Sequence, residues 1–179
     1  NEAVLKRMNK NHAFINSIGG KPAVTSMIYS EIIDNYIIEF CTPDSIVLRY
    51  SNESVQVDKS HLELGKWWLK NAERKTYDTV IFDPSKPKIY KNCLNLWEGF
   101  STEPQKGSWK KTLLHIYKIL CNRQSTKFRY FLKWLAWCIQ NPARPAEVCV
   151  IFKGKEGAGK GFIFNQLTDI FGIHGFTLA

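Results

Sequence analysis

Long apolar runs are the first thing that this sequence lacks. No stretch approaches the ~20 apolar residues that a helix needs to span a bilayer. The opening segment, from Asn1 to Arg7, has no apolar core of the kind that marks a signal peptide. We therefore expect a cytoplasmic protein that has no membrane segment.

Paired cysteines are also missing. The chain has five cysteines, an odd and scattered set with no Cys-x-x-Cys pair: Cys41, Cys93, Cys121, Cys138 and Cys149. This pattern indicates neither a disulfide framework nor a zinc site. Reduced thiols, as in the cytosol, are the simplest interpretation.

No catalytic or metal-binding constellation can be assembled from the histidines. His12, His61, His115 and His174 are isolated from one another and from other ligands at metal-binding spacing, so we expect them to be structural or surface residues. Asp78 and Asp83 flank a short apolar segment and have the chemistry of a metal-binding pair. The Asp83-Pro84 step favours turn formation instead. The sequence thus predicts no metal site made of side chains.

Basic residues are abundant. The chain has 25 Lys and Arg against 16 Asp and Glu, a net charge of +9. The basic clusters lie at 66–75, 86–91, 106–111 and 127–133, with Trp67, Trp68, Tyr90, Trp109, Phe128 and Tyr130 among them. Phosphate neutralisation combined with base stacking is how proteins hold single-stranded nucleic acid without sequence preference. Contact with single-stranded nucleic acid is one interpretation of this pattern; the other is solvated helix faces with tryptophans in the core.

The first part of the chain alternates between helical and strand patterns. We predict helices over 1–17 and 59–72, and strands over 23–29, 36–41, 45–50, 54–57, 79–82, 89–90 and 94–97. Thr42-Pro43-Asp44 is expected to form a hairpin turn between two of these strands. Asp58 or Ser60 is expected to cap the helix that follows.

The second part is predicted to be mainly helical. One helix is expected over 111–122, and a second begins with Ser125 as its cap and reaches Ile139. The second helix has an apolar stripe and, on another side, Tyr130, Trp134 and Trp137. A helix that is apolar on two sides is expected to lie buried between layers.

A glycine-rich segment carries the only explicit chemistry. The apolar run 148–152, typical of a parallel strand covered on both faces, leads into Gly154-Lys155-Glu156-Gly157-Ala158-Gly159-Lys160-Gly161. A helix is predicted over 159–171, with Gly172 at its C-terminal cap. A strand, a Gly-rich loop ending in Gly-Lys and a helix form the layout of a phosphate-binding P-loop. The alternative is a mobile Gly-rich turn.

In a P-loop, backbone N–H groups surround the phosphates and the lysine reaches the outer ones. The predicted ATP-binding residues are Gly154, Glu156, Gly157, Ala158, Gly159, Lys160, Gly161 and Phe162, with Lys160 as the catalytic residue. Mg²⁺ normally takes a hydroxyl directly after the lysine. Gly161 stands there and Phe162 follows, so Mg²⁺ would need water or a more distant acid.

Four short segments in order resemble one family. They are Tyr77 to Pro84, Asn95 to Phe100, Trp134 to Pro142 and the Gly-Lys-Gly loop. Together they resemble the primase–helicases of bacteriophages and mobile elements, which are similar to the poxvirus-type enzymes with superfamily 3, AAA+-like motors. The resemblance covers roughly residues 70–175 and is less clear over 1–65.

The resemblance implies a homo-hexameric ATPase that moves along single-stranded DNA in the host cytoplasm, with a primase or primase–polymerase module upstream. It also implies an acidic pair, a polar sensor and an arginine finger, which would lie beyond Ala179. We therefore expect residues 1–179 to belong to a longer protein and to be inactive alone.

The expected fold class is α+β, in three parts. Residues 1–104 form a small antiparallel-sheet accessory domain, 105–145 a helical subdomain, and 146–179 the first β–P-loop–α unit of an AAA+ core. The expected function is ATP-driven DNA unwinding within a replicative primase–helicase. The alternative is a DNA-binding or oligomerisation accessory module whose Gly-rich loop is incidental.

Overall fold

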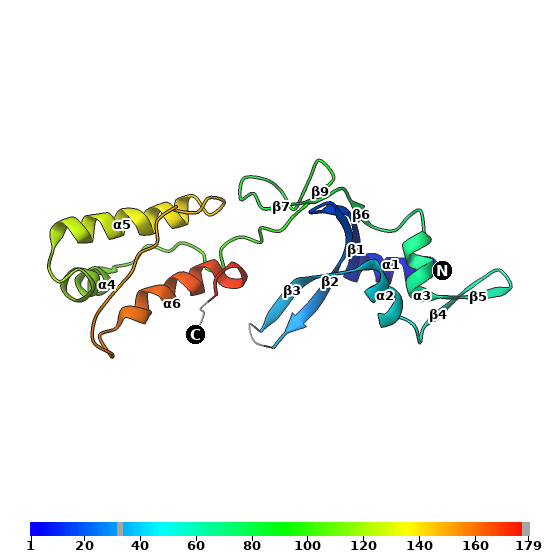
Figure 1. The fold of residues 1–179 in the computed structure, drawn as a ribbon, viewed down its shortest axis with the longest axis horizontal. Coiled ribbons are helices and arrows are strands. Elements are labelled where there is room, and N and C mark those ends of the chain that lie inside the picture. Colours follow the sequence, from blue (N-terminus) through cyan, green and yellow to red (C-terminus); the bar gives the residue numbers. More distant parts are fainter. Residues whose placement is uncertain (32–33, 177–179) are drawn as a thin grey trace. The chain divides into compact units, whose positions relative to one another are not determined.

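The computed structural model describes residues 1–31 and 34–176, and it divides into two compact units, Asn1–Trp97 and Glu98–Ala179 (Figure 1). Helices and small sheets are combined in the chain, which confirms the α+β class. Each unit has hydrophobic clusters of its own.

The first unit is built on a four-stranded sheet. Its strands are β1 (His12–Ile18), β2 (Lys21–Ser30), β3 (Asn35–Cys41) and β6 (Thr76–Tyr77), in the order β3-β2-β1-β6. The first three pair antiparallel in sequence order, whereas β6 joins β1 in parallel. Ala13 and Ile15 of β1 pack with Tyr77 on one face, in a cluster completed by Leu94.

Helices and a hairpin complete this unit. They are α1 (Glu2–Asn11), α2 (Pro43–Arg49), α3 (Leu64–Lys70), and β4 (Ser54–Val57) paired antiparallel with β5 (Ser60–Glu63). The fully buried Trp68 of α3 lies at the centre of their core. Its indole Nε1 donates a hydrogen bond to Asn9 Oδ1 at 2.9 Å, so the indole's polar atom is satisfied.

Near the start of the chain, one prediction was wrong in type and another in extent. Residues 45–50, predicted as a strand, lie largely in α2, because Thr42-Pro43-Asp44 is a helix start and not a hairpin turn. The Thr42 hydroxyl accepts a hydrogen bond from the Ser45 N–H at 3.3 Å, and Pro43 occupies the first turn. The helix predicted over 1–17 ends at Asn11, and His12 begins β1.

The helix predicted over 59–72 was correct only from Leu64 onward. Residues 60–63 form β5 and pair with β4, so neither Asp58 nor Ser60 caps a helix. A hairpin satisfies the backbone groups of this exposed segment with local hydrogen bonds, and strand pairing therefore overrides its helical spacing.

A small three-stranded sheet follows: β7 (Val80–Ile81), β8 (Ile89–Tyr90) and β9 (Cys93–Asn95), in the order β7-β9-β8. Its pairing confirms the strands predicted around 79–82, 89–90 and 94–97. The fully buried Asn95 fixes the intervening loop. Its Oδ1 accepts from the Asp83 N–H at 3.1 Å, and its Nδ2 donates to the carbonyls of Asp83 and Lys86.

The second unit is helical. It contains α4 (Lys110–His115), which runs directly into a π-helical turn η1 (Ile116–Leu120), then α5 (Ser125–Gln140), α6 (Lys160–Phe171) and a 3₁₀ turn η2 (Gly172–His174). Its core joins Ile116, Cys121, Phe131 and Ile163. The boundary between the units lies after Trp97, because the residues that follow bond to the end of α6: the Ser101 N–H donates to Ile170 O at 2.9 Å.

The predicted helices of this unit are confirmed, with small differences at their ends. Gln124, and not Ser125, precedes the first turn of α5. The expected burial of α5 on two sides was wrong for the described residues: Phe131 is the one buried residue there, while Tyr130 is 54% and Trp137 43% exposed.

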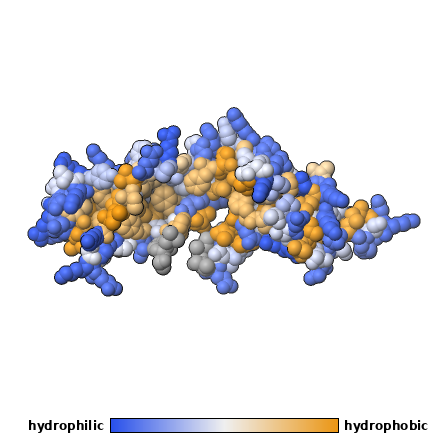
Figure 2. All heavy atoms as spheres, viewed as in Figure 1, coloured by the Kyte–Doolittle hydropathy of each residue, from blue (hydrophilic) through white to orange (hydrophobic). Residues whose placement is uncertain are grey.

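The segment 148–152 forms no strand with any described residue. Val150 and Phe152 pack against the helical core, while Ile151 is 83% exposed. A strand requires a neighbour for its backbone hydrogen bonds. The predicted strand of the P-loop layout is therefore absent from the described residues, and the AAA+ unit is not formed as expected. Figure 2 shows hydrophobic residues reaching the surface of this unit among hydrophilic ones.

Candidate phosphate-binding loop

The glycine-rich loop lies between the apolar segment and α6, and its backbone follows a tight turn. Gly157 and Gly159 both have φ of 74°, the left-handed region that favours glycine. Gly159 is the N-cap of α6 and supplies no capping side chain, and the first turn of α6 contains no acid. The positive end of the α6 dipole therefore has neither a capping side chain nor a local acidic partner.

Lys160, the first residue of α6, folds back over this loop. Its Nζ donates hydrogen bonds to the carbonyl of Gly154 at 3.1 Å and to that of Lys155 at 2.6 Å. The ammonium group thus lies at the mouth of the loop that the sequence predicted. Both partners are backbone carbonyl oxygens, and the amine could donate equally to the anionic oxygens of a phosphate.

His115 of α4 also contacts the loop, and sequence reasoning missed this contact. The His115 ring Nε2 lies 3.1 Å from the Gly159 carbonyl oxygen. The ring also packs edge-on against Phe162, with centroids 5.8 Å apart. Because 44 residues separate His115 from Gly159, no spacing rule of the sequence relates them.

The other predicted site residues lie along the same loop and the first turn of α6. Gly154, Glu156 and Gly157 are exposed, Ala158 is half-buried, and Phe162 is 46% exposed. A cradle of exposed backbone with one amine fits the phosphate groups of a nucleotide. The exposed Glu156 is the one acid in the loop, and no described contact assigns it a role.

The same residues fit a magnesium ion poorly. Gly161 has no side chain, and a Cβ placed there would meet no atom within 4 Å. The one hydroxyl on α6 belongs to Thr168, about two turns beyond Gly161, and it donates to Phe164 O at 3.0 Å. Among the described residues, no group of three or more His, Cys, Asp or Glu could hold a metal ion.

The two aspartates weighed as a metal pair have separate structural partners. Asp83 accepts hydrogen bonds from the N–H and the hydroxyl of Ser85 at 2.9 and 2.8 Å, which lower the pKa of its carboxyl group. Asp78 accepts from Asn16 Nδ2 at 3.2 Å. The turn predicted at Asp83-Pro84 is confirmed.

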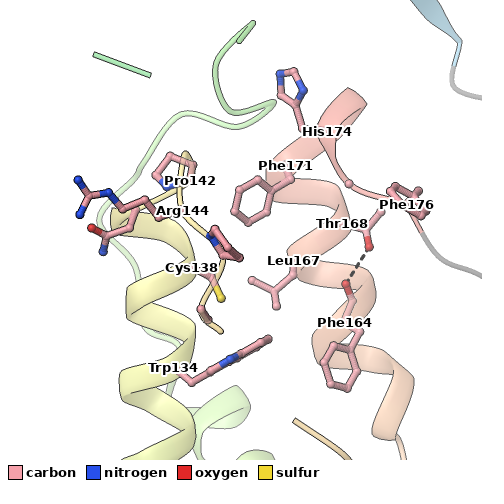
Figure 3. Close-up of a pocket in the computed structure, with 14 residues that line it drawn as sticks. Trp134, Cys138, Pro142, Arg144, Phe164, Leu167, Thr168, Phe171, His174 and Phe176 are labelled. Atoms are coloured by element: carbon pink, nitrogen blue, oxygen red, sulfur yellow. Dashed lines mark hydrogen bonds between the residues drawn. The ribbon is translucent and has the colours of Figure 1, made fainter. Parts of the chain in front are cut away.

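A cavity of about 510 Å³ lies between α5 and α6 (Figure 3). Trp134 and Cys138 line it from α5, and Leu167 and Phe171 from α6, whereas no residue of the glycine-rich loop does. In Figure 3 the Arg144 guanidinium points away from α6. Burial raises the pKa of the Cys138 thiol, which keeps it protonated and weakly nucleophilic. The cavity is mainly apolar and carries no evident chemistry.

Positive charge is concentrated in the second unit. Residues 98–179 contain twelve Lys and Arg and five Asp and Glu, which is +7 of the total +9. Residues 104–146 contain nine Lys and Arg and no acid at all. On α5, Arg129, Tyr130, Lys133 and Trp137 are all exposed and share one face by their helical spacing. We name these four residues the α5 outer face.

A groove of about 640 Å³ begins beside this face. It lies between the start of α5 and the segment 150–153, with Lys127, Tyr130 and Lys153 among its lining residues. Ile151 and Phe152 supply an apolar wall. The groove combines two amines with an aromatic ring, which suits a phosphate and a base.

Comparisons with protein-family models, with curated proteins and with solved structures found no match to this chain. Within the described part of the chain, no helix combines the length and the apolar character that crossing a membrane requires. Function is therefore inferred from the loop and from the distribution of charge.

Proposed function

We propose that this chain contains the phosphate-binding loop of an ATP-dependent DNA helicase of the primase–helicase type. The observation that carries the proposal is the loop itself. Two glycines in left-handed conformation precede a helix start without a side-chain cap, and the Lys160 amine lies over the loop carbonyls. This combination of backbone donors and a lysine is suited to the outer phosphates of ATP.

In this proposal each residue has one task. ATP, when bound, supplies the phosphoanhydride bond whose hydrolysis drives movement. The N–H groups of residues 157–161 hold the phosphate oxygens, and Lys160 leaves its two carbonyl partners to offset the phosphates' negative charge. Phe162 and the rest of the first turn keep the helix start in place. No side chain at position 161 contributes an oxygen to Mg²⁺.

Single-stranded DNA is the proposed partner. The supporting observation is the acid-free stretch 104–146 together with the α5 outer face, where two cations alternate with two exposed rings. Cations neutralise phosphates and rings stack on bases, so one helix face supplies both interactions. A homo-hexamer and a primase module on the same polypeptide belong to the same proposal.

The decisive experiment compares Lys160→Ala with wild type in the full-length protein. ATP hydrolysis should fall by about a hundredfold or more, because the charge on the phosphates is no longer offset. Single-stranded DNA binding should change little. Lys118→Ala, which removes an exposed lysine of the same unit outside the loop, is the matched control and should hydrolyse ATP normally.

The second candidate function is a DNA-binding or oligomerisation module with an incidental loop. The concentration of positive charge in the second unit favours it independently of the loop. Under this alternative, Lys160→Ala leaves ATP hydrolysis unchanged while DNA binding persists in both proteins. Retained hydrolysis in the variant would therefore remove the loop from the active site and favour the module.

A further inference from the structure

His115 is the one residue of α4 with a described hydrogen bond from its side chain to the phosphate loop. Its Nε2 lies 3.1 Å from Gly159 O, within hydrogen-bonding distance. A carbonyl oxygen can only accept, so Nε2 must be the donor and must carry a proton. The bond ties the helical segment to the residue directly before Lys160.

Because the peptide bond is planar, the hydrogen bond from His115 to the Gly159 carbonyl also sets the direction of the Lys160 N–H. In a trans peptide the carbonyl and the next N–H point to opposite sides of the same plane. Holding the Gly159 carbonyl toward His115 therefore aims the Lys160 N–H away from His115. That N–H is one of the first of α6, which have no partner within the helix and form the anion-binding end.

The ring lies directly against Gly159 as well as bonding to its carbonyl. A Cβ on Gly159 would lie 2.7 Å from His115 Cε1, so the ring occupies the space that any other residue at 159 would need. The ring also packs edge-on against Phe162 of the first turn. His115 thus contacts residues that precede and follow Lys160 in the sequence.

We propose that His115 is a positioning residue of the phosphate loop, which holds the Gly159–Lys160 peptide so that its N–H faces a bound phosphate. This inference rests on the proposed nucleotide-binding function. Through His115, α4 would then directly affect the affinity of the loop for nucleotide.

The test measures ATP affinity by equilibrium binding of a fluorescent ATP analogue to the full-length protein. His115→Phe keeps a ring beside Phe162 and loses the donor, and its affinity should fall about tenfold, the effect of one hydrogen bond. His115→Gln places an amide N–H at similar reach and should recover affinity to within about threefold of wild type. His61→Phe, at an exposed histidine of the first unit, is the matched control.

The outcomes separate this inference from the proposed function. If wild type binds no nucleotide, or if Lys160→Ala binds it as well as wild type does, the proposed function fails. If Lys160→Ala loses affinity but His115→Phe binds like wild type, only the positioning role is overturned. Melting temperatures measured without nucleotide test for a purely structural role. If His115→Phe and His115→Gln melt at the same temperature but differ in affinity, the positioning role is supported. If the loss of affinity in each variant parallels a lower melting temperature, the positioning role is contradicted.

Discussion

Gly161 is the residue at which this loop differs most from a phosphate loop with an ordinary metal site. The position has open space around it, and its backbone is helical without a positive φ. A side chain therefore fits there without displacing a neighbour. The absence of a hydroxyl at this position is a property of the sequence and not a steric requirement of the fold.

We predict that Gly161→Ser lets Mg²⁺ support ATP binding at lower concentration. The new hydroxyl stands where phosphate loops usually hold Mg²⁺, so the Mg²⁺ concentration for half-maximal binding should fall several-fold. Gly161→Ala is the control, because it raises helix propensity by up to about 1 kcal/mol without adding an oxygen. Equal magnesium dependence of the Ser and Ala variants would contradict the prediction.

His12 is a buried residue of the first unit. It is 5% exposed, with Nδ1 2.9 Å from Ser26 Oγ and Nε2 2.7 Å from the Tyr50 hydroxyl. Burial, and then the charge of Arg49, lowers the pKa of His12 below its usual 6.5. The folded protein thus favours the neutral ring more than the unfolded chain does.

We predict that this residue makes the first unit less stable in acid. Above about pH 6.5 the His12 ring is neutral in the unfolded chain too, and the folded state has its full stability. This stability is lost as the pH falls through the lowered pKa that His12 has in the folded state. Urea unfolding at pH 7.5 and 5.5, followed by tryptophan fluorescence, measures the difference. His12→Gln should reduce it, and an unchanged difference in that variant would assign the acid sensitivity to other groups.

At the scale of elements, α5 is the helix whose exposed residues differ most from its predicted burial. Its length and position followed from apolar spacing, and the structure confirms them. The exposure of Tyr130 and Trp137 did not follow, because spacing identifies which residues share a face and cannot say whether another layer covers it. Together with Arg129 and Lys133, these rings form the α5 outer face.

We predict that this face contributes to single-stranded DNA binding in two separable ways. Arg129→Gln with Lys133→Gln should weaken binding and reduce the slope of log affinity against log salt by about 0.7 for each phosphate that is no longer neutralised. Tyr130→Ala with Trp137→Ala should weaken binding by about 1–3 kcal/mol per stacked base and leave the salt slope unchanged. Fluorescence anisotropy with a labelled oligonucleotide at several salt concentrations measures both.

The control pair for these variants lies on another helix. Lys6→Gln with Lys10→Gln removes two exposed lysines from α1 in the first unit and should leave the salt slope unchanged. If the control pair has the same effect as the α5 pair, binding depends on net charge alone. That result would contradict a defined DNA-binding face.

Each mispredicted element has a physical reason that residue spacing does not show. For α2, Thr42-Pro43 has the chemistry of both a turn and a helix start, and the cap hydrogen bond to Ser45 decides between them. For β5, the pairing with β4 overrides helical spacing. For 148–152, an apolar run predicts burial, but a strand also needs a neighbour, and none of the described residues provides one.

At the scale of the whole molecule, the chain is two units with separate cores. The clusters around Trp68 and around Ile15 both lie within residues 1–97, and the cluster around Phe131 lies within 98–179. Charge is divided unequally as well, with +2 on the first unit and +7 on the second. The glycine-rich loop and the α5 outer face both belong to the second.

We predict that residues 1–97 fold when produced alone. Both clusters and all three sheets of this unit are formed within it, so its urea unfolding should be a single cooperative transition. Circular dichroism and tryptophan fluorescence should give the same midpoint. A broad transition, or different midpoints from the two probes, would show that this unit depends on residues beyond 97.

The candidate site could be located from the sequence but not completed. The Gly-Lys motif and the apolar run before it are local, so Gly154 to Phe162 could be named without a structure. His115 could not, because its contact with Gly159 depends on how α4 packs against the start of α6. The position of the Lys160 amine on two loop carbonyls was likewise outside what spacing can predict.

The open start of α6 has a practical consequence for any measurement on this protein. A helix end with no side-chain cap and with a lysine beside it does not distinguish one oxyanion from another. If the loop binds nucleotide as proposed, sulfate or inorganic phosphate in a buffer would compete for the same N–H groups. Affinities should therefore be compared only in chloride buffers of matched ionic strength, because a weak signal in phosphate buffer would report the competitor and not the loop.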